Sequence, residues 1–256
     1  MSLNDFSPID RFVLRLGRLS PLGLREREVL QDLRGRIFQA EAGTDLIARG
    51  SHADHVHLIV EGLCGRFAQF SDGERQITAL HIAGDVPDLH TVAARSAAPS
   101  LQTLVTSTLI RLPVDQMAAL VRSHPAIGEA FWAYSAFDAM LLERWAANLG
   151  RRTAVQRMAH LLCEMALRLE DAAHGTCRDF ALPITQPQLG DALGLTPVHV
   201  NRTLKMLREQ GLVTITGRRV LVHDWTRLAE LGDFDPSYLL LGGASPAHSR
   251  GEGVTA

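Results

Sequence analysis

The chain has 256 residues, 46% of them hydrophobic, and a formal net charge of -2 at pH 7. This length accommodates two domains, and the near-neutral charge restricts any contact with phosphate groups to one region of the chain. Three widely spaced cysteines indicate a reducing cytoplasm and no disulfide framework, and the lack of a bilayer-spanning apolar run or a secretory signal predicts a cytoplasmic protein with no membrane partner.

Residues 36–113 contain short apolar or alternating runs that are separated by turn signals such as Asp72-Gly73. This spacing predicts an antiparallel β-roll or sandwich, and the helices that follow make the fold class α+β. The expected strands are residues 37–40, 46–49, 55–60, 65–70, 76–81, 101–106 and 108–112. We assign residues 1–122 to this N-terminal roll, together with a helical arm.

Residues 125–149 change to a helical period and predict one long helix. Its aromatic-rich stripe consists of Ile127, Phe131, Tyr134, Phe137, Leu141 and Trp145. Two arrangements would bury this stripe: a seam between two copies of the chain, which we favour, or packing on the chain's own β-domain. Residues 123–150 are therefore assigned to a dimerisation helix and a hinge, which we place at Gly150 because residues 148–152 interrupt the helical pattern.

The segment 184–222 carries the local signals of two short helices joined by a glycine turn. Thr185 and Gln188 have the spacing of a capping box, and Gly194 stands where the first helix needs a left-handed residue. Thr196 can cap the second helix, which is apolar on one side and basic on the other. This is the layout of a DNA recognition helix, although a helical hairpin with no nucleic-acid partner is the alternative.

Residues 212–216 and 220–222 alternate as two strands around a turn that carries Arg218 and Arg219, which predicts the wing of a winged helix. Residues 182–223 contain five basic and two acidic side chains, a net charge of +3, whereas the whole chain carries -2. Local positive charge favours contact with DNA phosphates. We assign residues 151–228 to this domain and residues 229–256 to a C-terminal tail that is partly disordered.

A β-roll, a long helix, a hinge and a winged helix-turn-helix follow one another in this chain, and this order resembles the Crp/Fnr family of bacterial transcription regulators. The resemblance covers residues 20–225. Its most specific motifs are residues 184–212, Val60-Glu61-Gly62, Ile82-Ala83-Gly84-Asp85 and Arg157-Met158-Ala159. It implies a homodimer whose cyclic-nucleotide-binding-like jelly roll senses a signal and reorients two recognition helices on a near-palindromic site. It also implies a protein that is not an enzyme, with double-stranded DNA, a second copy and RNA polymerase as partners.

The resemblance also implies roles for single residues of the DNA-binding domain. Arg202 matches the family arginine that contacts a guanine edge, and bidentate bonding to O6 and N7 suits arginine to this place. The family commonly has glutamate where this chain has Val198, so the half-site should differ from the best-known family sequences. The other recognition-helix candidates are Thr196, His199, Asn201 and Lys205. The candidates for phosphate contact are Thr185, Gln186, Gln188, Arg218 and Arg219.

An effector pocket is expected in the roll around Gly84, Asp85, Asp88, His90 and Arg95. Family members that bind cyclic nucleotides place a Gly-Glu pair and an Arg-Ser pair around the phosphate. No Gly-Glu pair follows Gly84-Asp85, so we expect no cyclic nucleotide, and Arg95 would carry the phosphate if one bound. No cysteine precedes Cys64, which opposes an N-terminal iron–sulfur cluster. We predict no cofactor, and residues 84–90 either line a ligand pocket or pack on the long helix.

The alternative function is a cupin-like metal-binding enzyme or sensor. His55 and His57 would lie on one face of a strand, and His90 could complete a three-histidine metal site. The alternation of this strand opposes that site, because it places Val56, Leu58 and Val60 inward and turns His55, His57 and Ile59 outward or toward a neighbouring element. An enzyme also has no need of a basic, exposed recognition helix, so we predict no metal site and no catalytic residue.

Overall fold

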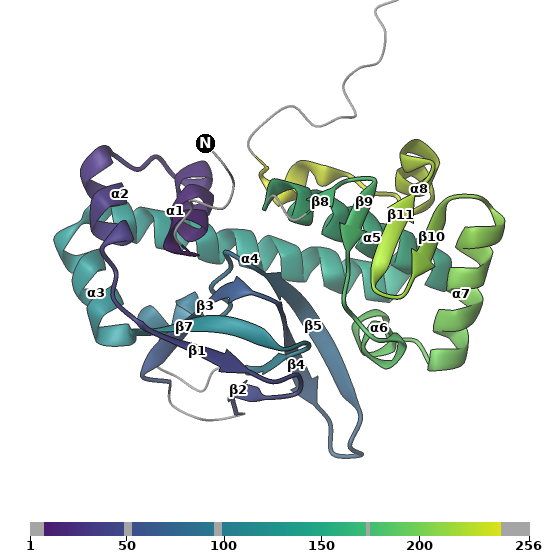
Figure 1. Ribbon diagram of the computed structural model, residues 1–256, viewed down its shortest axis with the longest axis horizontal. Helices are drawn as coiled ribbons and strands as arrows, with labels where there is room; N and C mark the ends of the chain where they lie inside the picture. Colours follow the sequence, from purple (N-terminus) through teal and green to yellow (C-terminus); the bar gives the residue numbers. More distant parts are fainter. Residues whose placement is uncertain (1–7, 49–52, 95–98, 173–174, 242–256) are drawn as a thin grey trace, which may run out of the picture.

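The computed structural model describes residues 8–48, 53–94, 99–172 and 175–241. The N-terminal domain is the predicted antiparallel roll, in which the sheet β1-β7-β3 faces the sheet β2-β6-β4-β5 (Figure 1). Its strands are β1 (Arg36–Ala40), β2 (Asp45–Ile47), β3 (His55–Glu61), β4 (Leu63–Gln69), β5 (Arg75–Ile82), β6 (Ser100–Thr103) and β7 (Ser107–Pro113). Each predicted strand corresponds to one of these, with ends that differ by a few residues.

The turn from β3 to β4 depends on Gly62. This residue has a φ of +109°, and a Cβ built on it would lie 2.2 Å from the Oγ of Ser107. Both the backbone conformation and the space therefore require glycine, which explains the Glu61-Gly62 motif by local sterics.

The predicted helical arm consists of α1 (Pro8–Leu19) and α2 (Leu24–Gln31). The apolar side of α1 packs on the roll and on the long helix α4, where the ring of Phe12 lies 6.1 Å from that of Phe131. A short 3-10 turn, η2 (Leu89–Val92), follows the loop after β5, and α3 (Val114–Ser123) leads from β7 into α4.

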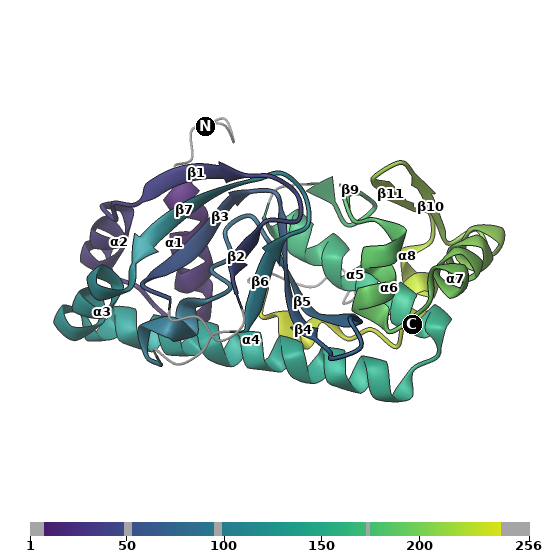
Figure 2. The same ribbon diagram turned by 90° about the horizontal axis from the view of Figure 1, so that it is seen from below.

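The long helix α4 (Pro125–Arg151) runs beneath both domains along the length of the molecule (Figure 2). Its packing corrects the expectation that the aromatic stripe forms a seam between two copies of the chain. The six side chains Ile127, Phe131, Tyr134, Phe137, Leu141 and Trp145 are only 0% to 7% exposed within a single chain. They pack on the roll, on the DNA-binding domain and on the C-terminal segment. Since both domains of one chain lie against the same side of α4, its most apolar face is buried there.

The break between α4 and α5 (Ala154–Asp171) lies later than predicted. Gly150 is helical, and the chain becomes extended at Arg152, with ψ of 148°. Thr153 then caps α5 in a capping box with Gln156. The chain therefore changes direction at Arg152–Thr153, after the end of α4 and before the capping box that begins α5.

The C-terminal domain contains α6 (Gln186–Leu193), α7 (Pro197–Glu209), β10 (Val213–Thr216) and β11 (Arg219–Val222), as predicted in outline. Two further strands, β8 (Gly175–Thr176) and β9 (Asp179–Ala181), extend the wing into a sheet of order β10-β11-β9-β8. The sequence gives no alternating run for such short strands. The core is continuous across the domains, since Leu80 and Ile82 of the roll join Met158 and Leu162 of α5.

The predicted tail is folded up to residue 241. Helix α8 (Trp225–Leu231) crosses the predicted boundary at 228, and the 3-10 turn η3 (Pro236–Leu239) buries Tyr238 and Leu239 against α4 and α5. The remaining predicted tail, residues 242–256, lies outside the described residues. Across the part of the chain that the structure describes, no helix is long and apolar enough to cross a membrane.

Candidate nucleic-acid interface

The helix-turn-helix is set by the local signals of its sequence. The Oγ1 of Thr185 accepts from the backbone N–H of Gln188, and the side chain of Gln188 accepts from the backbone N–H of Thr185. Gly194 ends α6 with a φ of +62°, and Thr196 caps α7. These caps fix where each helix begins and ends, and so fix which side chains α7 presents to solvent.

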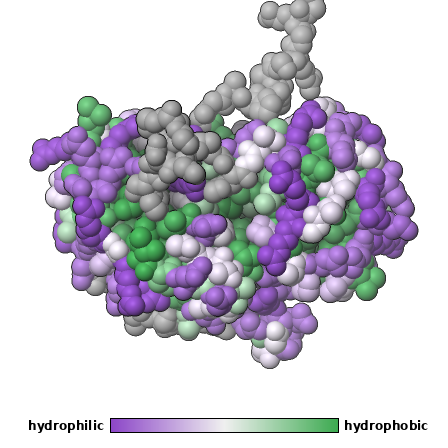
Figure 3. Space-filling model, in the orientation of Figure 1, coloured by the Kyte–Doolittle hydropathy of each residue, from purple (hydrophilic) through white to green (hydrophobic). Residues whose placement is uncertain are grey.

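Helix α7 buries one face and exposes the other. Val200, Thr203 and Leu207 are buried in the domain core. The exposed residues are Pro197, Val198, His199, Asn201, Arg202, Lys205, Arg208 and Glu209. Val198 is 75% exposed, so its methyl groups are available for an apolar contact with a partner. Hydrophilic side chains predominate at the outer edge of the molecule over α7 (Figure 3).

The candidate side chains of α7 differ in their engagement within the chain. The Nδ1 of His199 lies 3.1 Å from the Oγ1 of Thr196, and the Nδ2 of Asn201 donates to the carbonyl of Pro197. Lys205 faces Glu209 at 3.6 Å. Among the described residues, the exposed guanidinium of Arg202 makes no hydrogen bond or ion pair. Its donors are therefore available to a partner.

The two wing arginines are not equivalent. Arg219 forms a two-pronged pair with Asp179 of β9, at 2.6 and 2.7 Å, and this hydrogen bonding lowers the pKa of Asp179 and raises that of Arg219. Arg218 is exposed at the turn and has no such carboxylate among the described residues. A phosphate can meet Arg218 directly, whereas Arg219 would first have to leave Asp179.

The three residues at the start of α6 that were predicted to contact phosphate have different surroundings in the structure. Thr185 and Gln186 are exposed at the start of the helix. Gln188 instead points to the roll, where its Nε2 donates to the carbonyl of Leu104. This side chain therefore serves the cap and the domain interface, which corrects its assignment as a DNA contact.

The roll holds α6 through polar contacts that no sequence motif predicts. The Nε of Arg75, on β5, lies 2.5 Å from the Oδ2 of Asp191 in α6. The next residue, Gln76, donates to the carbonyl of Asp191 at 2.6 Å. Arg157 of α5 donates to the carbonyl of Leu193. The end of α6, and with it the turn into α7, is thus fixed from both the roll and α5.

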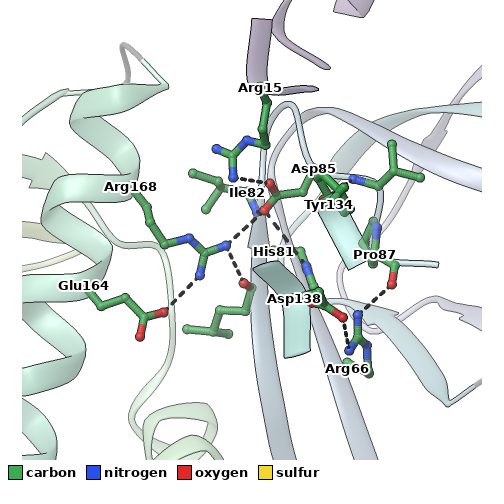
Figure 4. A network of polar contacts seen from close by, with 12 residues as sticks. Arg15, Arg66, His81, Ile82, Asp85, Pro87, Tyr134, Asp138, Glu164 and Arg168 are labelled. Atoms are coloured by element: carbon green, nitrogen blue, oxygen red, sulfur yellow. Dashed lines mark hydrogen bonds and ion pairs between the residues drawn. The ribbon is translucent and has the colours of Figure 1, made fainter. Parts of the chain in front are cut away.

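The predicted effector loop is occupied by the chain's own side chains. Asp85 pairs with Arg15 of α1 at 2.8 Å and with Arg168 of α5 at 3.0 Å (Figure 4). Asp88 accepts from the backbone N–H and lies 2.7 Å from the ring Nδ1 of His57. Arg95 lies outside the described residues. A cyclic phosphate would meet two buried carboxylates here, so the described residues of this loop do not fit that ligand.

The pair Asp85–Arg168 belongs to a larger buried network. Arg168 also donates to Glu164 and to the carbonyl of Leu80. Burial opposes the charge of Arg168, but Asp85 and Glu164 outweigh it and raise its pKa. Burial, with Arg66 and Arg168 close by, lowers the pKa of His81 well below its usual value, so this ring stays neutral. The network joins α1, the roll and α5, which are far apart in the sequence.

The long helix also holds the loop. The hydroxyl of Tyr134 accepts from the backbone N–H of Val86 at 2.9 Å. Arg66 of β4 bridges Asp138 of α4, at 2.9 Å, to the carbonyl of Pro87 (Figure 4). Of the two roles considered for residues 84–90, these contacts support packing on the long helix.

The alternative metal site is not assembled. His57 and Ile59 are buried, not outward, because β3 is covered on both faces: Val56 and Leu58 pack against the helices, while Ile59 packs inside the roll. His57 is held by Asp88, and burial lowers the pKa of His90. No group of three His, Cys, Asp or Glu among the described residues could hold a metal ion.

Known proteins resemble both domains. A family model for the cyclic nucleotide-binding domain matches residues 37–124, and one for the Crp-like helix-turn-helix domain matches residues 156–231. The nitrogen fixation regulation protein FixK of Azorhizobium caulinodans is 31% identical over 182 residues, 70% of this chain and 72% of that protein. The transcriptional activator protein FnrL of Cereibacter sphaeroides is 30% identical over 199 residues, 74% of this chain and 77% of that protein.

A solved structure agrees with these matches. The structure of FixK2 from Bradyrhizobium japonicum has a TM-score of 0.70 and 26% sequence identity, and the match covers 78% of this chain and 98% of that chain. These relatives are regulators and not enzymes, which removes the cupin-like enzyme as a function of this chain.

Proposed function

Because this chain belongs to the Crp/Fnr family of DNA-binding transcription regulators, we propose that it acts as a homodimer that reads a near-palindromic site with one Arg202 in each half. The observation that carries the base-reading role is the free guanidinium of Arg202, which α7 holds on its exposed face next to Val198. Arginine satisfies guanine O6 and N7 together, and valine contacts a thymine methyl group, so the half-site should contain guanine near thymine.

Arg202→Ala is expected to weaken binding to the specific site by about 1–3 kcal/mol and to relax preference at one base pair. The site is first obtained by selecting a random-sequence DNA pool with the purified protein, and the affinities of both proteins are then measured on that site and on single-base variants. An equal loss on every sequence would show that Arg202 contacts phosphate and would overturn its base-reading role.

Arg218→Ala is expected to reduce the slope of log K against log salt by about one and to weaken binding to all sequences alike, as loss of a phosphate contact does. Arg219→Ala is the matched control on the same turn. Because Asp179 already neutralises Arg219, its removal should change the slope less. Equal slopes for Arg218→Ala and wild type would contradict the proposed wing contact.

We place the dimer seam on the outward face of α4, opposite the aromatic stripe. Exposed residues recur there with alternating spacings of four and three, as in a coiled-coil seam. They are Trp132, Ala136, Ala139, Glu143, Ala146 and Gly150. Small side chains allow two helices to approach closely. The seam is supported by the exposure of this face and by the two-fold site that a dimeric regulator reads.

We divide the chain by function at residues 124 and 152, with the roll before α4 and the DNA-binding domain after it, including residues 225–241. A signal at the roll would reach α7 through Arg75, Gln76 and α6. RNA polymerase is the proposed second macromolecular partner, since the relative FnrL is a transcriptional activator. Transcription in vitro from a promoter that carries the selected site tests this partner.

A further inference from the structure

Trp132 is unusual among the tryptophans of the chain. Trp145 is buried, and Trp225 packs against the core of the DNA-binding domain, but Trp132 is 78% exposed on α4. An indole buries a large apolar area when it finds a partner surface, so an exposed indole that also lines an apolar groove marks a candidate contact surface.

A groove of about 550 Å³ adjoins this indole. Helix α4, helix α3 and the 3-10 turn η2 line this groove. The α4 residues are Gly128, Phe131, Trp132 and Ser135, and apolar neighbours such as Leu89, Val92, Ala118 and Val121 complete most of the lining. A surface of this kind favours an apolar side chain as its occupant.

The four α4 residues of the groove lie along one edge of the outward face. Relative to Trp132 they stand at positions minus four, minus one, zero and plus three, which enclose one gap on the surface of the helix. Trp132 belongs both to this gap and to the outward face, so its exposed indole lies directly beside the groove. Gly128 lets α3 and α4 approach closely at the groove, since a Cβ built on it would lie 3.1 Å from the Cγ1 of Val121. The groove also continues the outward face of α4, on which we place the dimer seam.

We propose that Trp132 of each protomer inserts into this groove on its partner, so that η2 becomes part of the dimer interface. This inference rests on the proposed dimer and specifies one of its contacts. Asp85 and Asp88 hold the loop that η2 directly follows. A displacement of that loop would therefore change the shape of the groove that receives the partner's indole. The contact would thereby couple the roll to the strength of dimerisation.

The test is hydroxyl-radical footprinting of the full-length chain, with oxidation of Trp132 measured by mass spectrometry below and above the dimerisation concentration. Sedimentation equilibrium on the same samples reports the dimer independently. We expect oxidation of Trp132 to fall several-fold as the dimer forms, while exposed Leu24 on α2 keeps its rate. A dimer in which Trp132 stays accessible overturns this inference and leaves the proposed function intact. Failure to dimerise, even on DNA, contradicts the proposed function itself.

Two variants test the contact between Trp132 and the partner's groove, one at the indole and one in the groove. Trp132→Ala removes the indole, and Ala118→Phe fills the groove from α3 without changing α4. Each should raise the dimer dissociation constant about thirtyfold, the effect of losing a central aromatic anchor. The double variant should be no weaker than either single one, because both remove the same contact; additive losses overturn the proposal. Leu24→Ala is the control. If a small molecule protects Trp132 of the monomer from oxidation, the groove is a ligand site, and the proposal that the partner's indole occupies it is overturned.

Discussion

Asp85→Ala is expected to lower the free energy of unfolding by about 3–5 kcal/mol, the cost of leaving a buried charge without its partner. The side chains of Arg168 and Asp85 are each 2% exposed, and that of Arg15 is 11% exposed. Removal of the carboxylate leaves two guanidinium groups facing each other with little solvent. It also orphans the backbone N–H of Ile82, which donates to Asp85 at 2.9 Å.

Urea denaturation followed by circular dichroism measures this loss. Asp179→Ala is a matched control, because its partner Arg219 is exposed and an ion pair at the surface contributes little to stability. The double variant Asp85→Ala/Arg15→Met should recover part of the loss, since it removes the charge that Asp85→Ala strands, while Arg168 keeps Glu164 as its partner. A loss no larger than that of Asp179→Ala would show that Arg15 and Arg168 find other partners.

Asp85→Ala should also affect the contact between the two domains. Arg168 belongs to α5 of the DNA-binding domain, while Asp85 belongs to the roll, and their bond joins residues 83 positions apart. The apolar part of the interface remains, because Leu80 and Ile82 still pack against α5. Hydrogen bonds are directional and apolar contacts are not, so we expect Asp85→Ala to loosen the relative orientation of the two domains while the shared apolar core still holds them together.

The helix-turn-helix could be predicted from the sequence because its determinants are local. Thr185 meets Gln188 and Thr196 meets His199 within a single turn, and Gly194 needs only its own backbone conformation. The strands of the roll were also predictable, since alternation and turn residues act over a few positions. The link from Arg75 to Asp191 could not be predicted in this way, because it joins residues 116 positions apart and no local pattern pairs them.

Helix α4 shows why the faces of an amphipathic helix can be assigned to the wrong partners. The strongest apolar stripe marks the most buried face, and in this chain its own two domains cover that face. The outward face is rich in alanine, which contributes little to a hydrophobic pattern although it suits close helix packing. His57 is a similar case, because strand alternation does not reveal that helices cover the second face of β3.

Ala139→Arg is expected to raise the dimer dissociation constant more than a hundredfold, on the order of 3 kcal/mol. Ala139 lies at the centre of the outward face of α4, and a two-fold axis would bring the two introduced guanidinium groups together. Neither could be desolvated without a partner, and the two would repel each other. The position is exposed in the single chain, so the fold of each protomer should be unaffected.

Sedimentation equilibrium gives the dissociation constant, and DNA fragments with one or two half-sites give the consequence for binding. Ala147→Arg is the matched control, since this exposed alanine lies at the edge of the same face, where coiled coils accept charge. The Ala139→Arg protein should bind both fragments with similar affinity, because a monomer gains nothing from the second half-site. If it dimerises as tightly as Ala147→Arg, the seam does not lie on this face, and the two-fold arrangement of Arg202 must arise from another surface of the chain.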